Sequence, residues 1–295
     1  MFSLRLSFKE VSYNFAKWKK NPRIIMVFVL AFVMCLMLSD RAISVAYSYG
    51  STMQIMEAFI WTFGDANSIL ISSLLLVLLF ADMPFISPDT QYHLVRCGRT
   101  NWLTGQLIYV CLATCIYLLF IVIVTAIICA PVSFTGNIWS ETAAIIGYSG
   151  MGSSIALPAS VKAMEMSSPY ECAILVFVLV LLYMLFISCV MLTVNLKKGK
   201  FWGVLSAFII SIVGLFLNPE IIRAIFGFPD AVMYKANVIV GWISPLNHAT
   251  YYMHNFGYDY LPRLYESILI FIEIIVILFL VSKKEIRRYS FSGNK

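Results

Sequence analysis

Long apolar runs recur along the whole chain, and few charged residues interrupt them. A helix that crosses the hydrocarbon core of a bilayer needs roughly 20 mainly apolar residues, with a range of about 17–25. The runs therefore predict an all-α, polytopic membrane protein with a single transmembrane domain over residues 1–295. Six transmembrane helices are expected, at 24–45, 60–81, 107–130, 173–196, 201–217 and 264–281.

Composition supports the membrane class. Hydrophobic residues make up 61% of the chain and charged residues 12%, whereas soluble domains are about half apolar and a quarter charged. The formal net charge is +6, but the basic residues gather at the ends of the apolar runs. We therefore expect membrane lipid as a partner, and no nucleic acid.

The distribution of charge predicts the topology. Of the 21 Lys and Arg residues, 16 fall in segments 1–23, 82–106, 195–200 and 282–295, and ten of the 15 acidic residues fall in the opposite connections. Basic residues favour the cytoplasmic side of a membrane. Both termini are therefore expected in the cytoplasm, with 282–295 as a cytoplasmic tail, and this requires an even number of spans.

Residues 3–20 are expected to form an interfacial helix. An apolar stripe at helical spacing lies among lysines and arginines, which is typical of a helix at the membrane–water boundary. The stripe consists of Leu4, Phe8, Val11, Phe15 and Trp18. Pro22 disfavours helix at the residue before it, so the helix should end near Asn21.

The cytoplasmic connection at 84–104 carries helix signals. Ser87 can cap a helix that has Pro88 at its first position, and Gly98 can end it. A helix of about ten residues is therefore expected across the cytoplasmic side. The outer connections are longer, at 131–171 and 218–263. We expect a short helix near 159–166 in the first and a re-entrant element over 232–246 in the second, because that apolar stretch is too short to span.

Motifs for catalysis are absent from the sequence. It contains no GxxxxGK[ST], HExxH or GxSxG pattern, no adjacent pair of Glu residues and no CxxC spacing among its seven cysteines. We therefore expect no enzyme activity in this chain alone, and no catalytic, cofactor-binding or metal-binding residues. Glu273 is the one ionisable residue deep in an expected span, which makes it a candidate for a pathway.

The layout resembles the permease subunits of ABC-2 type ATP-binding-cassette exporters. The resemblance rests on the basic amphipathic helix before the first span, the Arg96-Cys97-Gly98-Arg99-x-x-Trp102 pattern after the second, and Ile243-Ser244-Pro245 before the sixth. It covers nearly the whole chain through layout and loose motifs. The outer connection at 131–171 is longer than is usual for that family.

The resemblance implies a multi-pass subunit of the bacterial cytoplasmic membrane that acts with a separate cytoplasmic ABC ATPase. ATP and Mg would bind to that partner, and a second permease copy, identical or related, would complete a dimer. Residues 4–20 would be the connecting helix and about 88–97 the coupling helix. The candidate ATPase-coupling residues are Pro88, Gln91, Tyr92, His93, Val95 and Arg96. The implied function is export of an amphipathic or hydrophobic substrate such as a peptide, lipid or drug.

Two alternatives come from other classes. The chain could be a scaffold, sensor or immunity protein without transport, which binds a ligand or partner through its outer loops. It could also be an ion- or proton-coupled carrier that uses Glu273. Recovery of an ATPase with the purified chain separates the exporter from the scaffold, and substitution of Glu273 tests the carrier.

Overall fold

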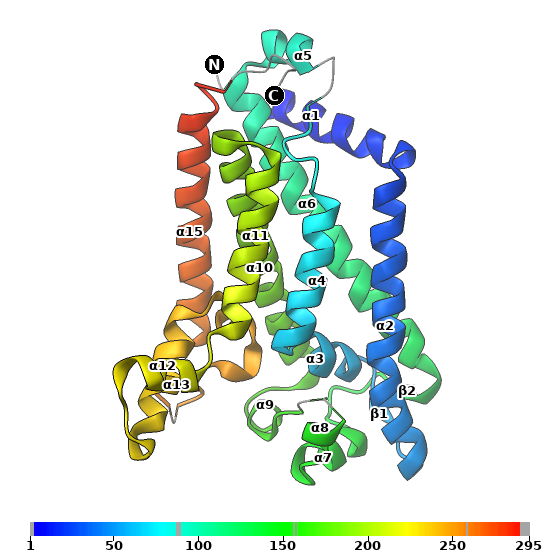
Figure 1. Cartoon of the computed structure of the whole chain (residues 1–295). Helices are drawn as coiled ribbons and strands as arrows, with labels where there is room; N and C mark the ends of the chain where they lie inside the picture. The colour runs from blue at the N-terminus through cyan, green and yellow to red at the C-terminus, as the bar shows by residue number, and fades with distance from the viewer. Residues whose placement is uncertain (1–2, 87–89, 156, 158, 258, 290–295) are drawn as a thin grey trace.

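The computed structural model describes residues 3–86, 90–155, 157, 159–257 and 259–289, with side chains described throughout except at 91–93 and 153. These residues form an elongated helical bundle (Figure 1). Helix α1 (Leu4–Ala16) and the C-terminal end of α15 (Leu264–Glu285) lie at one end, which we call the terminal end. The opposite end is the loop end.

The predicted all-α class is confirmed for the described residues, whose strands are two segments of two residues each. Four helices are long and apolar enough to cross a membrane: α2 (Pro22–Tyr49), α6 (Arg99–Cys129), α10 (Pro169–Lys198) and α15. At 1.5 Å per residue, the 28 residues of α2 extend about 42 Å. That exceeds the roughly 30 Å hydrocarbon core.

Two further apolar segments are bent helix pairs. Helices α3 (Glu57–Phe63) and α4 (Ala66–Leu79) meet at 85°, and α11 (Lys200–Phe216) and α12 (Pro219–Phe226) meet at 80°. If each bent pair counts as one span, the described residues contain up to six crossings. The 14 residues of α4 extend only about 21 Å, which explains why the second apolar run of the sequence is short.

The predicted interfacial segment corresponds to α1 followed by a 3-10 turn, η1 (Lys17–Lys20). Helix α1 lies across the terminal end and packs on α6 (Figure 1). Gly105 of α6 makes this approach possible, because a Cβ there would lie 2.8 Å from Glu10 Cβ and 2.9 Å from the Ser7 carbonyl oxygen. The side chain of Ser7 donates a hydrogen bond to the Asn101 carbonyl oxygen at 3.0 Å. The N-terminal helix is therefore part of the bundle.

Both outer connections form compact structure at the loop end. Strands β1 (Met53–Gln54) and β2 (Ser133–Phe134) pair in parallel. The short helices are η2 (Ala130–Val132), α7 (Glu141–Tyr148), α8 (Met151–Ser154), α9 (Val161–Met166), η3 (Asp230–Val232), α13 (Met233–Ile243), α14 (Pro245–Ala249) and η4 (Tyr251–Met253). The helix predicted near 159–166 thus has two companions, and the stretch at 232–246, which was predicted to be re-entrant, consists mainly of α13 and the start of α14.

A buried carboxylate attaches the first outer connection to the bundle. Glu57 is 1% exposed, and it accepts hydrogen bonds from the Ser140 backbone N–H at 2.8 Å, the Ser140 hydroxyl at 2.6 Å and the Gln54 N–H at 3.1 Å. Beside it, the rings of Trp61 and Trp139 stack with their centroids 5.2 Å apart. Residues before and after α6 are therefore tied together at the loop end.

We predict that Gly105→Leu loosens α1 from α6. The added side chain would meet backbone and Cβ atoms of α1, which have no free rotation to avoid it, so we expect a loss of about 1–3 kcal/mol in unfolding free energy. The thermal unfolding midpoint in detergent should fall. Cys111→Leu, at an exposed position on the same helix, is the control and should leave the midpoint unchanged. Equal midpoints for both variants would contradict close packing of α1.

Candidate functional site

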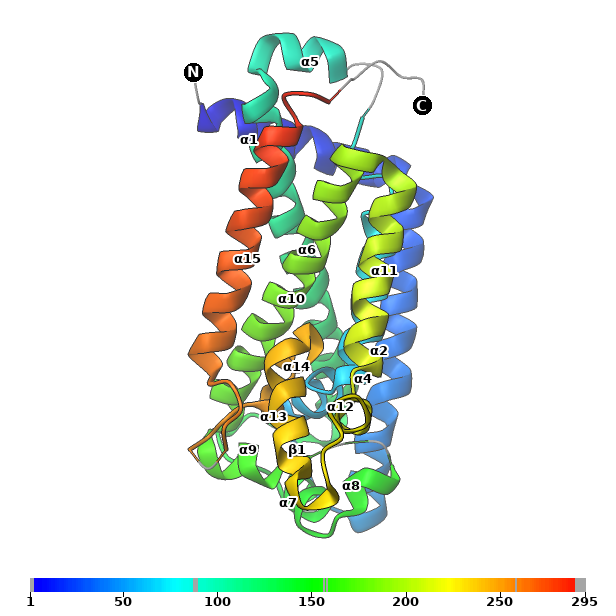
Figure 2. The ribbon, with the colours of Figure 1, turned by 60° about the vertical axis from the view of Figure 1, so that its left-hand side comes forward.

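The residues predicted to couple to an ATPase lie on or beside α5 (Thr90–Cys97), which stands at the terminal end (Figures 1 and 2). Pro88 lies outside the described residues, and the structure describes only the backbone of Gln91, Tyr92 and His93. Val95 is 88% exposed and Arg96 is also exposed. Both side chains are therefore accessible on the surface of this short helix.

Hydrogen bonds join the end of α5 to α1. Cys97 ends α5, Gly98 has φ +75°, and α6 begins at Arg99. The amide of Asn101 donates to the Cys97 carbonyl oxygen at 2.7 Å and accepts from the Ser3 N–H at 3.0 Å. One side chain therefore bridges the α5–α6 corner and the first turn of α1.

The same corner is joined to the C-terminal end of α15. The guanidinium of Arg99 donates through Nη1 to the carbonyl oxygens of Ile286 at 3.0 Å and Arg287 at 2.6 Å. Cations are favourable beside the free carbonyl groups at a helix C-terminus. A displacement of α5 would therefore act on α6, α1 and α15 together.

Glu273 is not brought to this corner. It lies near the middle of α15 on the exposed side of the helix, among the exposed side chains of Leu269, Ile272 and Ile277. A carboxyl group at this depth needs a hydrogen-bonding partner or a bound proton. It lines neither the loop-end cavity described next nor the two hollows at the terminal end that Trp18 lines.

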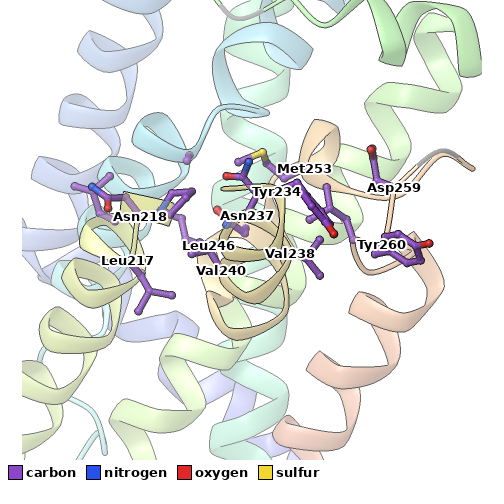
Figure 3. A pocket seen from close by; sticks show the side chains of 17 residues that line it. Leu217, Asn218, Tyr234, Asn237, Val238, Val240, Leu246, Met253, Asp259 and Tyr260 are labelled. Atoms are coloured by element: carbon purple, nitrogen blue, oxygen red, sulfur yellow. The ribbon is translucent and has the colours of Figure 1, made fainter. Parts of the chain in front are cut away.

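A cavity with a volume of about 620 Å³ opens at the loop end (Figure 3). Ligand pockets are commonly about 300–1,000 Å³. Its walls come from the start of α4, the α11–α12 bend, α13, α14 and residues 259–261. Ser244 fixes α14 against α11, because its hydroxyl donates to the Gly214 carbonyl oxygen at 3.1 Å.

The lining is mainly apolar, with neutral polar groups distributed around it. The amides belong to Asn218, Asn237 and Asn247, and the phenols belong to Tyr234 and Tyr260 (Figure 3). The carboxylate in the lining, Asp259, is paired with the ammonium group of Lys162. The cavity therefore suits a ligand that is largely apolar and carries uncharged hydrogen-bonding groups.

Helices α14 and η4, which border this cavity, are attached to α15 through two buried histidines. Ser267 Oγ lies 2.7 Å from His248 Nδ1 and 2.8 Å from His254 Nε2. The other ring nitrogens face backbone carbonyl oxygens, of Trp242 for His248 and of Thr250 and Tyr251 for His254. Burial lowers the pKa of His254 to about 4. The cluster therefore couples α14 and η4 to α15, with His254 neutral at pH 7.

The cavity and the histidine cluster were not predicted from the sequence. Asn218, Asn237 and Asn247 were a usable signal, since they are three of the four Asn residues in the connection at 218–263. His248 and His254 are far enough apart in sequence that only the turn at 249–253 brings both rings to Ser267. Within the described residues, no three His, Cys, Asp or Glu side chains are placed to hold a metal ion.

Comparisons with known protein families, with curated proteins and with solved structures each found no match.

We predict that His254 makes the fold less stable in acid. Its pKa is lowered from 6.5 to about 4, so below about pH 6.5 the unfolded chain binds a proton that the folded chain does not. Stability should fall as the pH falls through this window, by up to about 1.4 kcal/mol per pH unit. The shift of the unfolding midpoint between pH 7 and pH 5 should be smaller in His254→Gln. His93→Gln is the control, and a shift equal to wild type in His254→Gln would refute the assignment.

Proposed function

We propose that this chain is the transmembrane permease subunit of an ATP-driven exporter of the ABC-2 type, with ATP and Mg bound by a separate ABC ATPase. In this proposal each bent helix pair is one crossing, which makes six, and the terminal end faces the cytoplasm of a bacterium. The positive-inside rule supports this orientation, because segments 1–23, 82–106, 195–200 and 282–295 carry 16 of the 21 Lys and Arg residues.

The observation that carries the proposal is the junction of α5 with three other helices. An exposed helix at the terminal end meets α6 at a single glycine, and Asn101 and Arg99 tie that junction to α1 and α15. A connecting loop needs no such attachment. A surface that receives force from a motor protein does, because movement must reach the spans.

The proposed mechanism follows this connection. Closure of two ATPase subunits would displace α5, and α6 would carry the displacement as one continuous helix of 31 residues. At the loop end α6 leads through η2 into β2, which pairs with β1 just before α3. The neutral, mainly apolar cavity beside the α11–α12 bend is the proposed outer site for an amphipathic substrate.

A second permease copy is proposed to cover the exposed side of α15. About nine residues separate Leu264 from Glu273, so the carboxyl group lies roughly 14 Å along the helix axis. Exposure of that group to lipid hydrocarbon would be costly. In a dimer whose twofold axis is normal to the membrane, the same residue of each copy lies at the same depth. The two Glu273 carboxyl groups could therefore meet across the interface and share a proton.

A second candidate function is a membrane sensor or immunity protein without transport. The outer cavity and the well-packed loop end favour it, because ligand binding there requires no motor. Purification in mild detergent distinguishes the two functions. Recovery of an ATPase with the chain supports the exporter, and its absence under conditions that keep the chain folded supports the sensor.

We predict that Val95→Ala combined with Arg96→Ala lowers substrate-stimulated ATPase activity of the copurified complex at least tenfold. The two substitutions remove an exposed apolar contact and a cation from the proposed motor surface, while the bundle keeps its packing. Tyr148→Ala, at an exposed position of the loop end, is the control and should retain activity. Normal ATPase stimulation and normal partner binding in the double variant would exclude α5 as the coupling helix.

We also predict that Glu273→Cys, in a background without the seven native cysteines, forms a disulfide-linked dimer under mild oxidation. In the proposed dimer, residue 273 of each copy lies at the same depth at the twofold axis, so the two cysteines meet. Ile123→Cys, on the exposed side of α6, should remain monomeric. If purified dimers resist cross-linking at residue 273 and at the neighbouring Leu269→Cys, α15 is not the dimer interface.

A further inference from the structure

Two hollows adjoin at the terminal end, where α1 turns into α2. One is a polar hollow of about 180 Å³ between the end of α1, residues 82–86, α6 and the start of α11. The other is an apolar groove of about 490 Å³ along α2 and α6. Trp18 and Ile24 line both. The two hollows therefore form one continuous polar and apolar surface, which we call the α1–α2 site.

The polar hollow contains a buried amide without a partner. Asn14 is 3% exposed, and neither its Nδ2 nor its Oδ1 has a hydrogen-bond partner among the described residues. Leaving a buried donor and acceptor unpaired is unfavourable. A ligand that offers both an acceptor and a donor would satisfy this side chain.

The charges around the hollow favour an anion. Lys17 and Lys200 line it from η1 and from the start of α11. The carboxylate in the lining, Asp82, pairs with Arg23 at 2.7 Å. The remaining charge on the hollow is therefore positive, as phosphate binding requires.

The groove has the opposite character. Phe28, Val29, Phe32 and Phe120 line it, and Lys19 stands at its end. The indole of Trp18 donates to the Tyr109 hydroxyl at 2.8 Å, which fixes a side chain that lines both groove and hollow. Tryptophan is enriched where head groups meet hydrocarbon, and the start of α2 at Pro22 places the groove just inside that boundary.

We propose that the α1–α2 site binds one anionic glycerophospholipid. Its phosphate and head-group hydroxyls occupy the polar hollow, against Lys17, Lys200 and Asn14, and one acyl chain lies along the groove. A zwitterionic lipid fits less well, because its own cation would lie beside two lysines. A free phosphate also fits less well, because it would leave the groove empty. This lipid would hold α1, α2 and α11 together, and the site does not depend on whether the chain transports anything.

The test is native mass spectrometry of the purified full chain with phosphatidylglycerol, phosphatidylcholine or glycerol 3-phosphate. Phosphatidylglycerol should bind most tightly. Lys17→Gln combined with Lys200→Gln should weaken it about 30-fold, since each lysine contributes roughly fivefold. Lys20→Gln combined with Lys197→Gln removes two nearby lysines outside the lining and should change binding little. Equal binding of both lipids, or no loss in the first double variant, overturns the proposal.

A second pair of variants tests the groove. Val29→Trp fills it at an exposed position and should release phosphatidylglycerol, whereas Val33→Trp, exposed on the same helix but outside the lining, should not. Glycerol 3-phosphate should bind weakly to wild type and be unaffected by Val29→Trp. Tight binding of glycerol 3-phosphate, with lipid binding unchanged in Val29→Trp, would show a free-phosphate site and refute the lipid.

Discussion

Backbone polar groups cannot remain unpaired in hydrocarbon, and this constraint determines where the chain is allowed to bend. Each sharp bend has a side chain that replaces the lost helical hydrogen bonds. Asp65 accepts from the Asn67 N–H after α3, Asn218 from the Ile221 N–H after α11, and Ser244 from the Asn247 N–H after α13. The α3–α4 and α11–α12 pairs therefore turn by 85° and 80° with one N–H of the second helix bonded to a capping side chain. The loop-end cavity lies beside two of these bends, because its lining includes Asn218 at the first and Leu246 and Asn247 just after the second.

Small residues then set how closely the helices approach. A Cβ at Gly203 would lie 1.8 Å from Asn195 Oδ1, so only glycine allows the α10–α11 contact. The amide of the same Asn195 donates a hydrogen bond to the Met83 carbonyl oxygen at 2.6 Å, beyond the end of α4. Gly105 has the same role between α6 and α1. In a membrane, where burial of apolar surface does not favour helix association, such close contacts and hydrogen bonds provide the specificity.

The sequence predicted the elements that depend on local signals. The apolar runs indicated the long helices, and the stripe with Asn21-Pro22 indicated α1 and its end. The 85° bend between α3 and α4 was not predicted, because the expectation of one helix at 60–81 ran through the turn residues Gly64 and Asp65, and no proline marks the bend. Glu57 interrupted that run without revealing Ser140 as its partner, 83 residues away. The exposure of Glu273 was equally unpredictable, since a helix apolar all round does not show which side faces its neighbours.

Helix α6 connects the two ends of the bundle. At its start it contacts α1, α5 and α15, in its middle α2 and α10, and near its end α3 and η2. A rigid helix with such contacts transmits displacement only if its two ends are attached to separate parts of the molecule. Both ends of α6 are attached in this way. The terminal end is held by Asn101 and Arg99, and the loop end by the β1–β2 pair together with the Glu57 hydrogen bonds. The α1–α2 site lies beside the terminal attachment, at Tyr109 of α6. A lipid bound there would stiffen the same helix that the proposed mechanism requires to move as one body.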